Sequence, residues 1–336
     1  MARVLFSGRQ MVIHQRVANA TERQTARFIA SALTVPLFVL AACGTSAGPG
    51  SVPASADGGS NSGDGAAQSA GGPIGGSRPT AVHVPPSYVA GTPMPLVVLL
   101  HGYGASGAIE DAYLGLTALS DSRGFLYAHP DGTTDSSGLK FWNATDACCD
   151  IHGAAVDDST YLSDLIQQIA ARYAVDSKRV FLFGHSNGGF MAYRMACDHG
   201  DQIAAIVSVA GAMWNDVSRC PAKTTVSVLE VHGTSDATIV FTGGANQGHD
   251  YPGAQSTVND WVTIDGCATT PDTSAPALDL DSTIPGAETT VSKYQVDCKP
   301  GGAAQLWTMQ GSGHIPAFNA GFGTAAIDFL YAHPKP

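Results

Sequence analysis

The stretch that decides the fold is RVFLFGHSNGGFMAYR, residues 179–194. It begins as a short apolar segment typical of a buried strand, passes through Gly184-His185-Ser186-Asn187-Gly188, and ends in a helix-forming segment. This order is the Gly-x-Ser-x-Gly nucleophile elbow, in which a sharp strand-to-helix turn exposes the serine hydroxyl. The glycines let the strand and the helix approach closely, and the helix N-terminus offers free N–H groups. Ser186 is therefore a candidate nucleophile, and the alternative is an ordinary Gly-rich turn.

Strand and helix signals alternate on both sides of this stretch. Apolar runs predict further strands at 95–100, 125–128, 203–209, 226–231, 291–296 and 306–309. Periodic apolar residues predict helices at 108–119, 159–173 and 324–333, with Asp157 or Asp158 as a cap of the second. This alternation implies an α/β protein with a doubly wound, mostly parallel sheet.

Functional groups in such sheets gather where the parallel strands end at their carboxyl ends. The strand 226–231 leads into His232-Gly233-Thr234-Ser235-Asp236, and the strand 306–309 leads to His314. The order Ser186, Asp236, His314 is the nucleophile, acid, histidine order of α/β-hydrolases, so these residues form the predicted catalytic triad. The alternatives are a turn-capping aspartate and an ordinary loop histidine. His249 also follows Asp236, but no predicted strand ends before it, and we expect it in a surface loop.

An oxyanion hole follows from the same placement. It requires the N–H of the residue after the nucleophile, Asn187, and a second N–H from the loop that follows an earlier strand. The loop His101-Gly102-Tyr103-Gly104 follows the strand 95–100, and Tyr103 is the expected donor.

Composition limits the partners. The chain has 336 residues, of which 44% are hydrophobic and 13% charged, and its net charge is -11. The hydrophobic share indicates a globular domain with a sizeable core, and the negative charge argues against nucleic acid and anionic membrane surfaces as partners.

The first residues are typical of an export signal. Arg16, Arg23 and Arg27 precede an apolar run at 28–42, and Leu40-Ala41-Ala42-Cys43 resembles a bacterial lipobox, in which Cys43 would be lipidated. We therefore expect a lipoprotein-type signal peptide at 1–42, a Gly/Ser/Pro-rich linker at 43–79 and the catalytic domain at 80–336. The alternative is an ordinary cleaved signal with an incidental Cys43.

Cysteine content fits an oxidising compartment. Apart from Cys43, six cysteines remain, an even number that allows 15 pairings. We favour Cys197 with Cys220, Cys267 with Cys298, and Cys148 with Cys149 as a vicinal pair. A metal site at Cys148, Cys149, Asp150 and His152 is the less favoured alternative.

With these residues assembled, the chain resembles the secreted esterases that include short-chain polyhydroxyalkanoate depolymerases, feruloyl esterases and acetylxylan esterases of carbohydrate esterase family one. The matching segments are 100–104, 141–149, 156–158, 184–189, 232–236 and 313–314. The resemblance implies a single α/β-hydrolase domain without a large lid. One departure concerns the substrate: many relatives carry Trp-Pro close after the histidine, whereas this chain has His314-Ile315-Pro316.

The resulting hypothesis is a serine esterase that works through an acyl-serine without metal or organic cofactor. The expected substrate is a polyester of the polyhydroxybutyrate type, and the alternative is a feruloyl or acetyl ester of plant cell-wall polysaccharide. A serine peptidase and a non-catalytic binding lipoprotein are further alternatives. Trp142 and Trp214 are candidates for an aromatic substrate wall, with ordinary packing as the other possibility. We expect a monomer, held to a membrane only through a lipid anchor, at the cell surface, in the periplasm or secreted.

Overall fold

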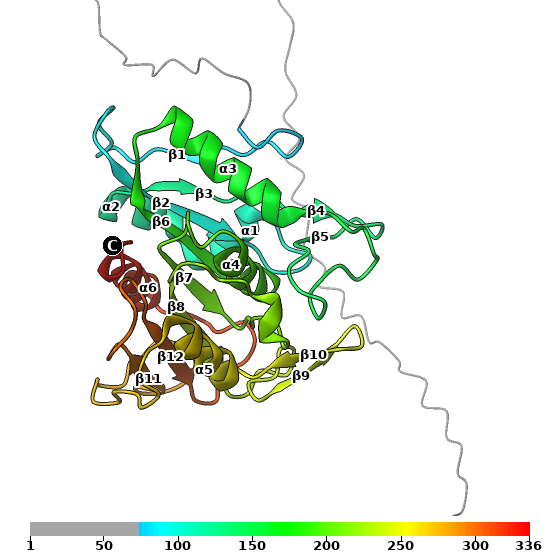
Figure 1. Ribbon diagram of the computed structural model, residues 1–336, viewed down its shortest axis with the longest axis vertical. Coiled ribbons are helices and arrows are strands. Elements are labelled where there is room, and N and C mark those ends of the chain that lie inside the picture. The colour runs from blue at the N-terminus through cyan, green and yellow to red at the C-terminus, as the bar shows by residue number, and fades with distance from the viewer. Residues whose placement is uncertain (1–73) are drawn as a thin grey trace, which may run out of the picture. The chain divides into compact units, whose positions relative to one another are not determined.

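The sheet at the centre of the protein has eight strands in the order β1-β3-β2-β6-β7-β8-β12-β11 (Figure 1). The computed structural model describes residues 74–336. The sheet strands are β1 (Val82–His83), β2 (Met94–Leu100), β3 (Leu126–Ala128), β6 (Val175–His185), β7 (Ala205–Val209), β8 (Ser227–Gly233), β11 (Thr289–Tyr294) and β12 (Ala304–Met309). The six inner strands pair in parallel, and only the edge strands β1 and β11 run antiparallel to their neighbours. The predicted mostly parallel sheet is confirmed.

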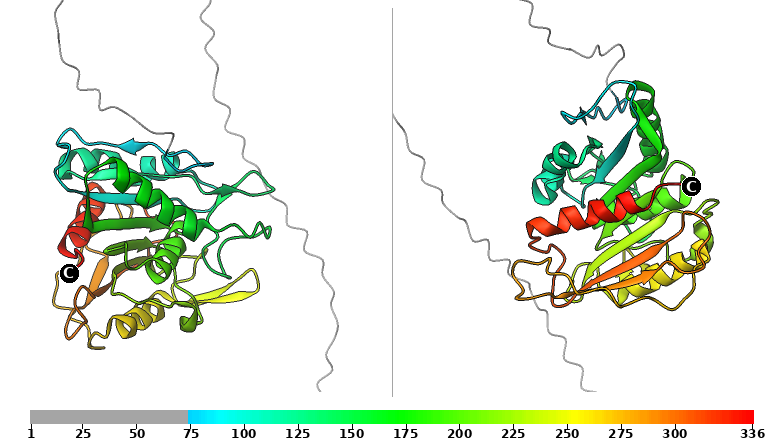
Figure 2. Two further views of the ribbon diagram at one scale, coloured as in Figure 1. Left: turned by 45° about the horizontal axis from the view of Figure 1, so that its top comes forward. Right: turned by 90° about the vertical axis from the view of Figure 1, so that its left-hand side faces the viewer.

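Helices cover both faces of the sheet, because the inner strands are apolar on both sides. On β2, Leu96, Val98 and Leu100 pack in one core cluster, whereas Val97 and Leu99 pack in the other. The first cluster lies under α3 (Asp158–Arg172), α4 (Asn187–Asp198) and α5 (Ala254–Asp265). The second lies under α1 (Gly107–Leu114), α2 (Leu116–Arg123) and α6 (Ala320–Ala332), as the views in Figures 1 and 2 show. This is the doubly wound arrangement that the strand and helix alternation predicts.

Several elements differ from the sequence-based expectation. The predicted helix 108–119 is two helices, because Gly115 takes a left-handed conformation with φ 68° that ends α1 and begins α2. The helix α5 and the hairpin of β9 (Gly243–Asn246) and β10 (His249–Pro252) were not predicted. The small hairpin of β4 (Thr133–Thr134) and β5 (Lys140–Phe141) lies between β3 and α3, where no element was predicted.

The packed part of the chain begins earlier than expected. Ile74 is only 4% exposed, and Nη1 of Arg78 lies 2.6 Å from Oδ1 of Asp158. Residues 74–79 therefore pack against the domain expected at 80–336. The predictions for the signal peptide, for Cys43 and for most of the linker concern residues 1–73, which lie outside the described part. Within residues 74–336, no helix is long and apolar enough to cross a membrane.

Three disulfides lie among the described residues. Cys197, near the end of α4, bonds Cys220 ahead of β8, and Cys267 after α5 bonds Cys298 after β11. The third joins the neighbours Cys148 and Cys149. These are the pairings that the sequence favours.

Candidate active site

Ser186 stands at the turn from β6 to α4, with a backbone conformation that an L-residue rarely adopts. Its φ and ψ are 54° and −120°. Such strain persists only where the surroundings impose it, and it clusters at functional sites. A Cβ at Gly184 would collide with the carbonyl oxygen of Gly188, and one at Gly188 would collide with that of Leu100. The two glycines therefore allow β6, α4 and the end of β2 to approach closely. This approach presents the Ser186 hydroxyl at the carboxyl end of β6.

The hydroxyl of Ser186 lies at one end of a hydrogen-bonded line of three side chains. Its Oγ is 2.9 Å from Nε2 of His314, and Nδ1 of the same imidazole is 2.8 Å from Oδ2 of Asp236. The carboxylate is held from its other oxygen, because Oδ1 accepts hydrogen bonds from the backbone N–H groups of Thr238 and Ile239 at 2.8 and 2.9 Å. The loops after β6, β8 and β12 thus bring these three residues together at one edge.

A second histidine faces the same carboxylate. His232 is 1% exposed, and its Nε2 lies 3.4 Å from Oδ2 of Asp236 and 2.8 Å from the carbonyl oxygen of Ile239. Its Nδ1 lies 3.0 Å from Oε1 of the buried Glu230. Since all these partners are acceptors, the ring is placed to carry protons on both nitrogens. Burial lowers the pKa of His232, but the bonds to Asp236 and Glu230 outweigh this and raise it to about 9.

This arrangement favours the charged form of Asp236. Burial alone raises its pKa, but hydrogen bonds from His232 and His314 together lower that pKa well below its ordinary value. The Asp236 carboxylate is therefore ionised at neutral pH.

The loop 101–104 runs beside the elbow. Its first residue, His101, is fully buried; Nδ1 lies 2.8 Å from the carbonyl oxygen of Gly102, and Nε2 accepts from the N–H of Gly132 at 2.9 Å. Burial lowers the pKa of His101, which fits a neutral ring with one donor and one acceptor. A Cβ at Gly102 would lie 3.6 Å from Cβ of Ser186, so the loop passes close to the hydroxyl.

The two expected oxyanion donors belong to the start of α4 and to the loop that follows β2. Asn187 is the first residue of α4, so its backbone N–H has no acceptor inside the helix. The N–H of Tyr103 makes no hydrogen bond to any other described residue. The side chain of Tyr103 points elsewhere, because its hydroxyl donates to Oδ2 of Asp135 at 2.7 Å.

Trp142 is in the core and not at a substrate wall. It is fully buried, and its indole N–H donates to the carbonyl oxygen of His101 at 3.1 Å. Its backbone exchanges two hydrogen bonds with the side chain of Asn187, at 2.7 and 2.8 Å, and that amide also faces Sγ of Cys148 at 3.5 Å. The packing alternative therefore fits Trp142, which fixes the segment 141–149 against the start of α4.

Trp214 is likewise almost buried, at 5% exposure. The guanidinium carbon of Arg219 lies 3.7 Å from its ring centroid, and that of Arg194 lies 5.4 Å away. Because two guanidinium groups occupy its surroundings, its ring faces cover protein and not substrate.

The alternative metal site lacks its ligands. Cys148 and Cys149 are bonded to each other, so neither thiol is free to coordinate. Among residues 74–336, no group of three or more His, Cys, Asp or Glu side chains is arranged to hold a metal ion.

Two buried pairs next to the site escaped the sequence analysis. Glu230 and His232 lie behind Asp236, as described above. Glu110 on α1 and His185 at the end of β6 form the second pair, with Nδ1 of His185 3.1 Å from Oε1 of Glu110. His185 and His232 both lie in motifs that the sequence analysis quotes, so the sequence alone could have pointed to them. Their buried carboxylate partners depend on tertiary contacts. His249 begins β10, and its side chain is 55% exposed at the surface.

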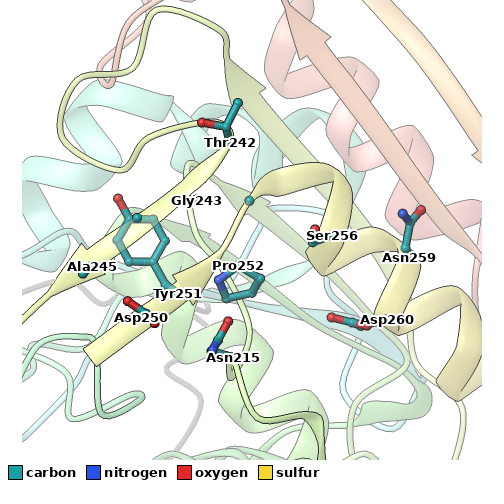
Figure 3. A pocket seen from close by; sticks show the side chains of 12 residues that line it. Asn215, Thr242, Gly243, Ala245, Asp250, Tyr251, Pro252, Ser256, Asn259 and Asp260 are labelled. Carbon is teal, nitrogen blue, oxygen red and sulfur yellow. The ribbon is translucent and has the colours of Figure 1, made fainter. Parts of the chain in front are cut away.

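A depression of about 780 Å³ lies beside these loops, between the β9–β10 hairpin and the start of α5 (Figure 3). Its lining contains no Lys, Arg or His, and its polar side chains include those of Asn215, Asp250, Ser256, Asn259 and Asp260. The ring of Tyr251, also in the lining, packs edge-on against Phe190, with centroids 6.0 Å apart, one turn of α4 after Ser186. Ser186 itself is not among the residues that line the depression.

The order of the strands and the strained serine at the turn from β6 to α4 are those of an α/β-hydrolase fold. Known proteins agree on the fold. The acetyl xylan esterase from Aspergillus awamori superposes with a TM-score of 0.54 at 19% sequence identity, over 75% of this chain and 93% of that one.

The chain belongs to an esterase family whose model, described as "Putative esterase", matches residues 72–250. One relative is a protein named feruloyl esterase B, of Piromyces equi. It is 26% identical over 269 residues, which are 77% of this chain and 46% of that protein. Another is named poly(3-hydroxyalkanoate) depolymerase C of Paucimonas lemoignei, 26% identical over 222 residues, 57% of this chain and 50% of that protein. The chain spans about half the length of these two relatives.

Proposed function

We propose that this chain is a serine carboxylesterase in which Ser186 is the nucleophile, His314 the general base and Asp236 the residue that orients it. The observation that carries the proposal is the line of two hydrogen bonds, at 2.9 and 2.8 Å, from Ser186 through His314 to Asp236. As Ser186 attacks an ester carbonyl, Nε2 of His314 takes the hydroxyl proton, and the ionised Asp236 stabilises the resulting imidazolium.

Charge develops next on the carbonyl oxygen of the substrate. The backbone N–H groups of Asn187 and Tyr103 are the proposed donors to this oxyanion, and neither needs to break a bond to another described residue. The N-terminal end of α4 adds its dipole to the same place. Collapse of the tetrahedral intermediate releases the alcohol, which receives its proton from His314, and water then repeats the steps to free Ser186.

The surroundings of the site favour a substrate with an apolar face. Of the eight large hydrophobic side chains exposed among the described residues, five stand in segments that follow the carboxyl ends of parallel strands. These five are Ile109, Leu139, Ile151, Val240 and Ile315. These exposed apolar side chains support a substrate with an apolar face. A polyester of the polyhydroxyalkanoate class, as in the name of one relative, is the first candidate substrate.

A feruloyl or acetyl ester carried on polysaccharide is the second candidate. The depression in Figure 3 favours it, because carboxylate and amide groups without a basic neighbour suit a polyol better than an anion. The name of the Piromyces equi relative points in the same direction.

Export is part of the proposal. Three disulfides within residues 74–336 fit an oxidising compartment. We propose that residues 1–42 direct export and that Cys43 is lipidated, which leaves a monomeric catalytic domain on a linker. Mass spectrometry of protein recovered from cell membranes would show a lipidated Cys43, whereas an N-terminus elsewhere would refute the anchor.

A side-by-side assay tests the function. Purified protein and its Ser186→Ala variant are given p-nitrophenyl butyrate, polyhydroxybutyrate, methyl ferulate and acetylated xylan. The proposal expects hydrolysis of the short ester by the parent protein alone, and the polymer that is cleaved fastest decides the substrate class. Equal hydrolysis by both proteins would refute a serine mechanism at this residue.

A further inference from the structure

Two buried polar side chains adjoin the Ser186 site without belonging to the proposed triad. Glu110, on α1, is 3% exposed, and His185, the last residue of β6 and the neighbour of Ser186, is 6% exposed. Burying an ion pair of this kind adds little stability by itself, because desolvation offsets the attraction. Their contacts indicate another role.

Glu110 holds the loop that carries the proposed oxyanion donor Tyr103. Its Oε2 accepts from the backbone N–H of Gly102 at 2.9 Å. This bond fixes the peptide unit between His101 and Gly102, which precedes the unit that carries the N–H of Tyr103. A Cβ at Gly102 would lie 3.6 Å both from Nδ1 of His185 and from Cβ of Ser186, so the loop, the pair and the serine are in mutual contact.

His185 holds the backbone of His314. Its Nε2 is 3.0 Å from the carbonyl oxygen of His314, and its Nδ1 is 3.1 Å from Oε1 of Glu110. Both partners are acceptors: Nε2 is hydrogen-bonded to the carbonyl, and Nδ1 lies in ion-pair contact with Glu110. Burial lowers the pKa of His185, but its bonds and charge contact with Glu110 and the carbonyl outweigh this and leave it raised.

The helix α1 supports the same loop at a second point. The hydroxyl of Tyr113, one turn after Glu110, donates to the carbonyl oxygen of Pro316 at 2.7 Å. Its ring lies 5.6 Å from that of His185 and 5.8 Å from that of Phe318. One face of α1 therefore contacts both the loop before Tyr103 and the loop that carries His314.

We propose that Glu110 and His185 are positioning residues, which hold the Tyr103 loop and the His314 backbone in one fixed frame around Ser186. Neither touches the reacting atoms. The inference rests on the proposed esterase function and adds to it the means by which the donor and the base keep their spacing. A displacement of about 1 Å in such a frame can cost on the order of 100-fold in rate.

The test compares Glu110→Ala, Glu110→Gln and His185→Ala by steady-state kinetics on p-nitrophenyl butyrate. Glu110→Ala and His185→Ala should lower kcat by about 10- to 100-fold and leave KM within about twofold. Glu110→Gln should restore kcat to within about threefold of the parent protein. Its amide oxygen can still accept from Gly102, and its NH2 group can donate to Nδ1 of a neutral His185 that keeps its bond to His314.

Asp265→Ala is the matched control. Asp265 is a fully buried carboxylate at the end of α5, outside the site. Its loss should change the unfolding temperature and leave kcat per folded molecule unchanged. If Glu110→Ala does not fold, His185→Gln replaces it, because one amide cannot donate to both Glu110 and His314 from their present positions, and kcat should again fall.

Full kcat in folded Glu110→Ala or His185→Gln would overturn the inference. So would a Glu110→Gln variant as slow as Glu110→Ala, since the effect would then come from charge and not from position. Ser186→Ala is assayed in parallel. If that variant is active, the proposed function fails; if it is inactive while the Glu110 and His185 variants are fully active, only the present inference fails.

Discussion

Nε2 of His232 lies 3.4 Å from Oδ2 of Asp236, the oxygen that also faces His314 at 2.8 Å. One carboxylate thus lies between two imidazoles, of which one continues to Ser186 and the other to the buried Glu230. Asp236 is therefore held by His232 as well as by His314. Its fixed carboxylate in turn orients the ring of His314, which we propose as the base.

Asp236→Asn should lower kcat by about 10⁴-fold, because an amide can donate to Nδ1 and thereby stabilise the wrong tautomer of His314. KM for p-nitrophenyl butyrate should change little. Steady-state kinetics with the folded variant checks this, and a loss of less than tenfold would argue against Asp236 as the orienting residue.

His232 should make the stability of the protein depend on pH. Its folded pKa of about 9 exceeds its ordinary value of 6.5, so its stabilising effect is complete below pH 6.5 and is lost as the pH rises toward 9. In urea unfolding, the free-energy difference between the parent protein and His232→Gln should shrink by up to about 3 kcal/mol between pH 6 and 9.5. A difference that stays constant over this range would show that His232 is not charged in the folded state.

Asn187→Ala should cost both stability and activity. It leaves the backbone N–H of Trp142 buried without its partner, at about 1–3 kcal/mol, and removes one of the two hydrogen bonds to the carbonyl of Trp142, which still accepts from the N–H of Cys149. The start of α4 would also lose its tie to the segment 141–149, so kcat should fall. Asn143→Ala is the control, because the Asn143 side chain makes a single hydrogen bond, to the carbonyl of Val156. Thermal unfolding should show a larger loss of stability in Asn187→Ala than in Asn143→Ala. An equal loss in the two variants would contradict the prediction.

Gly188→Ala should prevent the elbow from forming, because the new Cβ would collide with the carbonyl oxygen of Leu100. We expect a protein that is insoluble or inactive. Gly313→Ala, one residue before His314, is the matched control, since a Cβ there would meet nothing within 4 Å. Its unfolding temperature should equal that of the parent protein, and normal folding of Gly188→Ala would contradict the geometry given for the turn.

The sequence predicted the parts of the site that follow from local order. A strand, a turn and a helix placed Ser186, and the ends of two further strands placed Asp236 and His314, which the structure brings within hydrogen-bond distance of one another. The pairs Glu110–His185 and Glu230–His232 could not be predicted in this way. Glu110 lies 75 positions before His185 in the chain, and only the packing of α1 against the sheet brings them together.

Dependence on tertiary contacts also explains why the sequence could not decide between a substrate-wall role and a packing role for Trp142 and Trp214. An aromatic residue after a strand end can line a site or fill the core, and the difference depends on which loops fold over it. Trp142 is covered by the loop 101–104 and by α4, and Trp214 is covered by Arg194 and Arg219. No local pattern records these contacts.

The most direct test of the central claim, that Ser186 is the nucleophile, is covalent labelling with a p-nitrophenyl phosphonate followed by peptide mass spectrometry. The account predicts one phosphonyl group per molecule, on Ser186, gained in step with the loss of esterase activity and absent from Ser186→Ala. Inactivation accompanied by a label on another residue, or labelling of Ser186 that leaves activity intact, would contradict it.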